Sequence, residues 1–100
     1  MKNILIQTKE KLVSFLWDDV VDFNMFLAIK SQLEILGILD QNYVLISRDT
    51  NNDLDYLRDY SYKEFGYRKI CGMTFREVWF PFCDNNTIMI IPESILLNKQ

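Results

Sequence analysis

The sequence predicts a small α+β fold: two N-terminal helices, a strand, a third helix and a C-terminal antiparallel hairpin that form a small sheet of three or four strands. Three observations predict this class. Apolar residues recur at helical spacing through the first third of the chain. A β-rich pattern replaces that spacing after Gly66. Helical and strand patterns are partly segregated, which favours α+β over a parallel βαβ arrangement.

The first predicted helix covers residues Ile4–Val20, where Leu12, Leu16 and Val20 fall on one side at helical spacing. Its start is ambiguous, because Ile4-Leu5-Ile6 could equally begin a strand. Both alternatives remain open from the sequence alone.

The second predicted helix covers Phe23–Leu36. Asp22 or Asn24 is expected to cap it, since a short side-chain oxygen can accept from the free amides of a first turn. Gly37 follows the last apolar position and suits the left-handed residue that ends a helix. The helix therefore has both a start signal and a stop signal.

The rest of the chain alternates short β-rich runs with turn residues. A single strand is expected first, followed by a turn and a third helix. A further strand then precedes a hairpin in which Pro81, lacking an amide donor, requires an edge or a bulge. The expected bounds are a strand at Tyr43–Ser47, a turn at Asp49–Asp53, a helix at Leu54–Phe65, a strand at Tyr67–Cys71, hairpin strands at Thr74–Phe82 and Thr87–Ile91, and a helical turn at Glu93–Leu97.

Length and composition predict one domain spanning residues 1–100. Half of the chain is hydrophobic, enough for a core without disulfides. Cys71 and Cys83 form no CxxC pair, so we expect reduced thiols in the cytoplasm, or a disulfide if the chain is exported. No apolar stretch reaches the length of a membrane span, so no membrane is expected as a partner.

The chain contains no histidine. This excludes histidine general bases, Ser-His-Asp and Cys-His arrangements, and zinc–histidine sites. We expect a protein that is not an enzyme and that uses no cofactor. One alternative is a metal-dependent hydrolase built on Asp18, Asp19 and Asp22, but an acidic helix end and an N-cap explain those residues more simply.

A second acidic group consists of Asp49, Asn51, Asp53 and Asp55, and its Asp-x-Asn-x-Asp spacing resembles the start of an EF-hand loop. The resemblance ends there, because Leu54 stands where the loop needs glycine and Tyr60 stands where it needs a bidentate glutamate. A turn followed by an acidic first helical turn is the simpler interpretation. No metal site is therefore predicted.

The net charge of −3 and the pI of about 4.8 disfavour direct nucleic-acid binding, which usually needs a basic surface. The acid concentrates between Asp49 and Asp59. Such a segment can meet a basic cleft by electrostatic complementarity. We therefore expect an immunity- or antitoxin-type inhibitor that neutralises a cognate toxin, a nuclease, through an acidic surface. The predicted contact residues are four carboxylates and two tyrosine anchors: Asp49, Asp53, Asp55, Asp59, Tyr56 and Tyr60.

Two alternatives are kept beside this one. The first is a phage-encoded inhibitor of a host DNA-processing or defence enzyme that mimics DNA. The second is a structural module that associates with itself through a strand edge near Pro81. Trp79, Phe80 and Phe82 could form a partner surface, but we expect them to be core on both sides of their strand, because aromatic residues carry large buried area.

Overall fold

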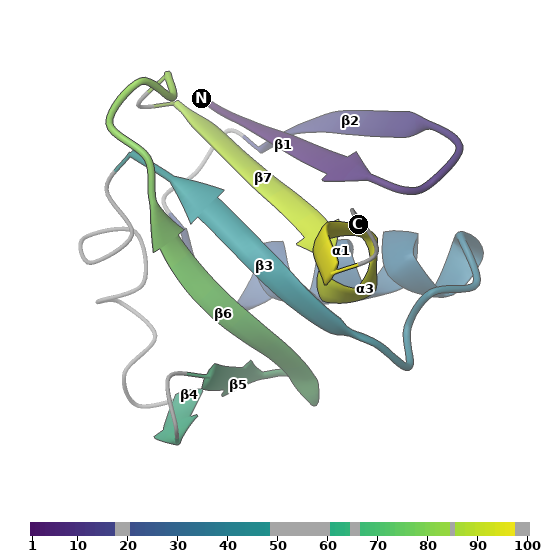
Figure 1. Cartoon of the computed structure of the whole chain (residues 1–100). Helices are drawn as coiled ribbons and strands as arrows, with labels where there is room; N and C mark the ends of the chain where they lie inside the picture. The colour runs from purple at the N-terminus through teal and green to yellow at the C-terminus, as the bar shows by residue number, and fades with distance from the viewer. Residues whose placement is uncertain (18–20, 49–60, 65–66, 85, 98–100) are drawn as a thin grey trace.

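The computed structural model describes residues 1–17, 21–48, 61–64, 67–84 and 86–97. Its strands form one mixed sheet in the order β2-β1-β7-β3-β6-β5-β4. Helix α1 covers one face of that sheet, and the short helix α3 lies on the other (Figure 1). The bounds are β1 (Lys2–Gln7), β2 (Leu12–Trp17), α1 (Phe23–Ile35), β3 (Asn42–Ser47), β4 (Ser61–Glu64), β5 (Tyr67–Ile70), β6 (Met73–Trp79), β7 (Thr87–Pro92) and α3 (Glu93–Leu97).

The predicted first helix is wrong, because residues 2–17 form the antiparallel hairpin of β1 and β2. Thr8 makes the turn: its hydroxyl donates to the Lys11 carbonyl at 2.9 Å and accepts from the Lys11 amide at 2.9 Å. A side chain that bonds nearby backbone in this way competes with helix formation. Ile4 and Ile6 then point to the core at the strand period of two.

Helix α1 confirms the second predicted helix: both begin at Phe23, and α1 ends at Ile35, one residue before the predicted end. The Asp22 carboxylate accepts from the Met25 amide at 2.9 Å, so Asp22 is the N-cap. Gly37 has a φ of +73°, the left-handed conformation expected just beyond a helix end. The stripe that faces the sheet consists of Met25, Phe26, Ile29 and Leu33.

The centre of the sheet corrects the predicted C-terminal hairpin. The strands β6 and β7 both exist but are not neighbours, because β3 lies between them. The strand β3 runs parallel to β6 and antiparallel to β7. Pro81 follows the end of β6 instead of lying within a strand, so the expected proline edge or bulge is also wrong.

The predicted third helix falls mostly on residues 49–60, which lie outside the described residues. The described part of it, β4, is a strand that pairs antiparallel with β5, so the helix does not extend through residues 61–64. Strand β5 itself is confirmed, and a turn at Cys71 and Gly72 joins it to β6. Both turn residues have positive φ, 54° and 79°, as a two-residue type I′ hairpin turn requires.

The core lies between α1 and the sheet. Phe75 of β6 sits at its centre, with its ring 5.5 Å from that of Phe26 on α1 and 5.6 Å from that of Tyr43 on β3. All three side chains are fully buried. Burial of apolar area drives folding, so this contact between helix and sheet is the main source of stability.

The expected arrangement of two N-terminal helices above a sheet of three or four strands is therefore wrong. The described part of the chain is dominated by strands, with α1 the longer of its two helices. No helix in the described ranges is long and apolar enough to cross a membrane. What positions the surfaces discussed below is the alternation of the strands, which sends odd and even residues to opposite faces.

Candidate partner-binding surface

The six contact residues predicted from the sequence, Asp49, Asp53, Asp55, Tyr56, Asp59 and Tyr60, all lie outside the described residues. The strand that precedes them in the sequence is described: β3 ends at Ser47, and Arg48 follows it. The acidic segment thus begins two residues beyond a fixed point at one end of the sheet.

Three strands finish at that same end of the sheet. Ser47, the last residue of β3, lies opposite Trp79, the last residue of β6. Ser47 also lies opposite Ile88, near the start of β7. At the same end, the last residue of β2, Trp17, lies opposite Lys2 at the start of β1. The stretches 18–20 and 49–60 therefore leave the sheet from one end, which we call the Trp79 end.

Charge is divided unevenly between the described fold and these two stretches. The described residues carry nine Lys or Arg and eight Asp or Glu, so they are close to neutral. Residues 18–20 and 49–60 together hold six Asp and a single Arg. The acidity of the whole chain thus comes from these two stretches. The stretch 49–60 begins at the Trp79 end and rejoins the described chain at Ser61, which lies opposite Ile70 and so near Met73 at the start of β6.

Large aromatic side chains are exposed at the same end. The exposed fractions are 64% for Trp79, 47% for Phe80 and 87% for Phe82. The rings of Phe80 and Phe82 meet edge to face, with centroids 5.8 Å apart. We call these three residues the aromatic corner. The expectation that they are core on both sides of a strand is wrong.

Backbone hydrogen bonds hold the aromatic corner on the sheet. The Phe80 amide donates to the Ser47 carbonyl at 3.0 Å, and the Cys83 amide donates to the Phe80 carbonyl at 3.2 Å. The first bond ties the corner directly to the residue before Arg48. The chain turns at Pro81, and this proline between two phenylalanines was the sequence signal that β6 ends before Phe82.

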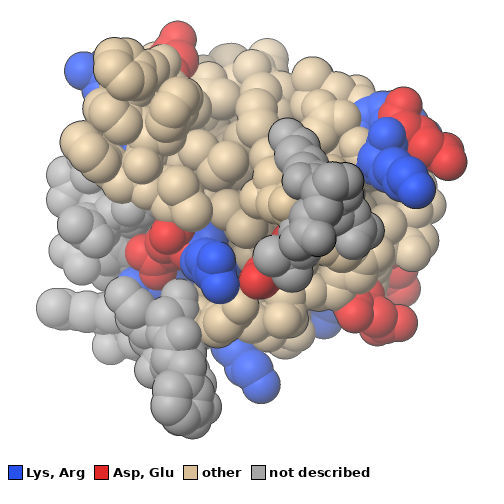
Figure 2. All heavy atoms as spheres, viewed as in Figure 1, with Lys and Arg blue, Asp and Glu red and all other residues tan. Residues whose placement is uncertain are grey.

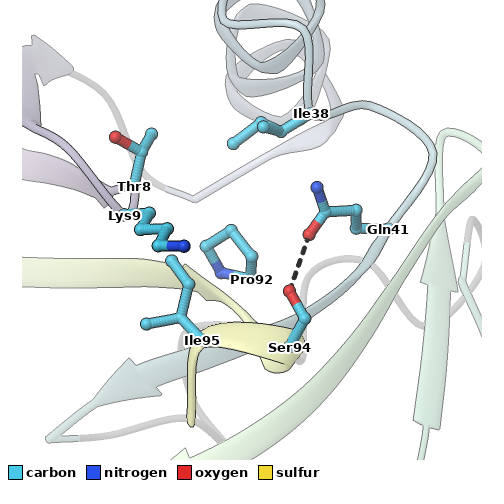
Figure 3. Close-up of a pocket in the computed structure, with 7 residues that line it drawn as sticks. All are labelled: Thr8, Lys9, Ile38, Gln41, Pro92, Ser94 and Ile95. Carbon is cyan, nitrogen blue, oxygen red and sulfur yellow. Dashed lines mark hydrogen bonds between the residues drawn. The ribbon is translucent and has the colours of Figure 1, made fainter. Parts of the chain in front are cut away.

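The opposite end of the sheet carries a cavity of about 460 Å³. Figure 3 shows its lining, in which Ile38, Pro92 and Ile95 supply apolar surface and Lys9 approaches from the β1–β2 turn. The Ser94 hydroxyl donates to Oε1 of Gln41 at 3.0 Å across it. The volume suits a small molecule, but the lining offers one cation and no acid–base pair.

Charged groups on the α3 side of the sheet pair with one another. Tyr67 donates its hydroxyl to the Glu93 carboxylate at 2.9 Å, and Arg76 lies 3.5 Å from the same carboxylate. The Arg76 guanidinium also lies 5.4 Å from the centre of the Tyr67 ring. These contacts join α3 to β5 and β6, so we assign them a structural role. Figure 2 shows the same face, where charged atoms gather mainly toward the margins of a largely uncharged surface.

Two titratable groups have shifted pKa values, and both shifts arise mainly from burial. Burial raises the pKa of Tyr43, whose hydroxyl donates to the Ile38 carbonyl. Burial also raises the pKa of the Cys71 thiol, against a smaller opposing effect of Lys30. Both shifts favour the neutral form at ordinary pH, which does not activate a nucleophile. Cys71 and Cys83 are free thiols.

The alternative of a metal-dependent hydrolase rested on three aspartates. Only Asp22 is among the described residues, and Asp18 and Asp19 lie outside them. Asp22 is occupied as the N-cap of α1. Within the described ranges, no three His, Cys, Asp or Glu side chains are grouped so as to hold a metal ion. The pairing of Asp22 with a backbone amide agrees with the capping interpretation.

Comparisons with known proteins place the chain in no family. No family model, no curated protein and no solved structure matches it. The expectation of an α+β immunity protein or antitoxin is corrected, because the described residues are dominated by strands and nothing in the comparisons supports those classes. We do not assign it to either class.

Proposed function

We propose that this chain is a non-enzymatic binding domain that docks onto a basic protein through the Trp79 end of its sheet. The observation that carries this proposal is the aromatic corner, where three large side chains remain exposed although the fold buries most of its other aromatic residues at least partly. Tryptophan is among the residues most enriched where protein interfaces gain their energy, and interface cores are rich in phenylalanine.

The acidic sequence that begins two residues after Ser47 supports a basic partner. Asp49 lies two residues beyond Ser47, whose carbonyl accepts from the Phe80 amide, and Asp53, Asp55 and Asp59 follow it in the sequence before Ser61. An apolar centre beside a set of like charges is a common interface design, since the apolar part supplies affinity and the charges supply orientation and association rate. Tyr56 and Tyr60 stay predicted anchors within that segment.

Three further expectations belong to the same proposal. The domain binds neither nucleic acid nor membrane directly, because its excess charge is negative. It works without a cofactor or metal. It acts in the cytoplasm, where its two free thiols would remain reduced.

The test is affinity capture from native cells with four baits: the unchanged chain, Phe80→Ser/Phe82→Ser, Asp49→Asn/Asp53→Asn/Asp55→Asn/Asp59→Asn, and Ile35→Ser. Ile35 is the matched control, because it is 74% exposed on α1 and lies beside the β1–β2 turn, at the opposite end of the sheet.

We expect the unchanged chain and Ile35→Ser to recover one basic protein at low salt, and to recover less of it as salt screens the charges. Both other baits should lose it. Recovery of that protein by all four baits, or recovery of no basic protein by the unchanged chain, would contradict the proposal.

A further inference from the structure

The free edge of β2 has a defined set of outward-facing backbone groups. Strand β2 ends the sheet and, among the described strands, pairs only with β1. The Thr8 amide donates to the Lys11 carbonyl at 2.8 Å, and the Asn3 amide donates away from β2 to Asn86 at 2.6 Å. Antiparallel pairs alternate between bonded and non-bonded positions. The amides and carbonyls of Leu12, Ser14 and Leu16 therefore point to the free edge.

This edge lacks the features by which proteins usually protect a terminal strand. The sequence Leu-Val-Ser-Phe-Leu-Trp contains no charge and no proline over six residues. Native sheets blunt such edges with lysine, proline, bulges or very short strands. At the other end of the sheet, β4 has only four residues and includes Lys63 and Glu64. Of the two edge strands that the structure describes, β2 has fewer of these protective features.

The side chains of β2 show which surface a partner strand would cover. Val13, Phe15 and Trp17 alternate toward the α1 side, where Phe15 and Trp17 pack against the core. Leu12 and Leu16 lie on the opposite face and are 53% and 64% exposed, with Ser14 between them. A paired strand would cover part of the exposed surface of both leucines, which is favourable in proportion to the area buried.

We infer that two copies of this chain pair through their β2 edges, antiparallel, with Ser14 opposite Ser14 of the second copy on the two-fold axis. A two-fold axis perpendicular to the sheet keeps each residue on its own face, so residues opposite each other must share a face. In this register all three outward-facing residues of each copy form hydrogen-bonded pairs. Leu12 then lies opposite Leu16 of the second copy, twice in the dimer.

Neighbouring registers fit less well. A shift of two residues in either direction separates both Leu12–Leu16 pairs and leaves one leucine of each copy without a β2 residue opposite it. The sequence of β2 is thus self-complementary in one register: leucine, small serine, leucine. The inference is independent of the proposed function, because it uses the β2 edge and not the aromatic corner. Each dimer would present two aromatic corners, one from each copy.

Sedimentation velocity over a concentration series tests the pairing. We expect the unchanged chain to show a species of twice the 12.0 kDa chain mass. Ser14→Pro should raise the dimer dissociation constant on the order of tenfold or more, because each copy loses a central donor and gains a bulky ring. The Ser14 amide faces outward, so this change breaks no hydrogen bond between β1 and β2. Phe82→Ser is the control and should leave the dimer unchanged.

A charge exchange tests the register. Leu12→Glu alone and Leu16→Lys alone should each be monomeric, since each places a charge opposite leucine. When the two chains are mixed, the new carboxylate and the new ammonium lie opposite each other and dimer should return. Circular dichroism verifies that each variant folds, and the charge pair stands alone as a test if Ser14→Pro does not fold. A monomeric unchanged chain at all concentrations, or no dimer in the mixture, would overturn the inference.

Discussion

The two faces of the sheet are built from the same strands but have different roles. On the α1 side, the side chains of β1, β3, β6 and β7 meet the helix and include the fully buried residues of the core. On the other side, only the short α3 covers part of the sheet (Figure 1), and Leu12 and Leu16 of β2 are exposed. The difference teaches that stability resides where α1 covers the sheet, whereas binding is expected at the Trp79 end and pairing at the β2 edge.

The largest expected effect is on the covered face. Phe75→Ala should lower the free energy of unfolding by about 3–5 kcal/mol, because it removes a buried ring between Phe26 and Tyr43 and leaves a cavity. Urea unfolding followed by circular dichroism measures this. A loss below about 1 kcal/mol would mean that the packing of α1 on the sheet is not the source of stability.

The next effect also belongs to the covered face. Tyr43→Phe should cost about 1–2 kcal/mol, because the Ile38 carbonyl loses its donor. The pKa of Tyr43 is raised above 10.0, so the unfolded state loses this proton first as pH rises. Its stabilising contribution is therefore complete below pH 10 and declines as pH rises toward the folded pKa.

Urea midpoints measured between neutral pH and strongly alkaline pH test that sign. The unchanged chain should lose stability above pH 10 more steeply than Tyr43→Phe does. Equal slopes would show that the Tyr43 hydroxyl does not differ between the folded and unfolded states.

A smaller effect, of opposite sign, is expected at the turn that joins β5 to β6. Cys71 has a φ of 54°, a conformation that asparagine tolerates better than cysteine. Cys71→Asn should raise the free energy of unfolding by about 0.5–1 kcal/mol. Cys83→Asn, where φ is not positive, is the control for loss of a thiol and should give no gain. Thermal unfolding of both variants compares them.

The smallest effect on stability is expected at the aromatic corner. Phe82→Ser should change the free energy of unfolding by less than about 0.5 kcal/mol, because its side chain is almost entirely in water. A loss as large as that of Phe75→Ala would break the comparison between the faces. It would assign the corner to the core and remove the support for a binding role.

Local signals in the sequence predicted some of these elements well. Helix α1 was predictable because a capping aspartate, an apolar stripe and a terminal glycine agree with one another. The strands β3 and β5 and the helical turn of α3 followed from composition and turn residues. The β1–β2 hairpin was not predictable from these signals. Its apolar residues fit helical spacing as well as they fit a strand: Leu12, Val13, Leu16 and Trp17.

Long-range pairing explains the other failures. No local pattern indicates that β3 inserts between β6 and β7, since that order depends on which strands exchange hydrogen bonds across some thirty residues or more of sequence. The aromatic corner was visible as residues but not as a surface, because exposure depends on where β6 ends. The acidic segment was predictable from charge alone, and its attachment beside the corner was not.

The most direct measurement is a calorimetric titration of the recovered basic partner with the unchanged chain, Phe80→Ser/Phe82→Ser and Ile35→Ser. The account predicts that the corner variant binds at least about tenfold more weakly while its thermal unfolding is unchanged, and that Ile35→Ser binds as the unchanged chain does. Equal affinity for all three chains would contradict it and place the binding surface away from the Trp79 end.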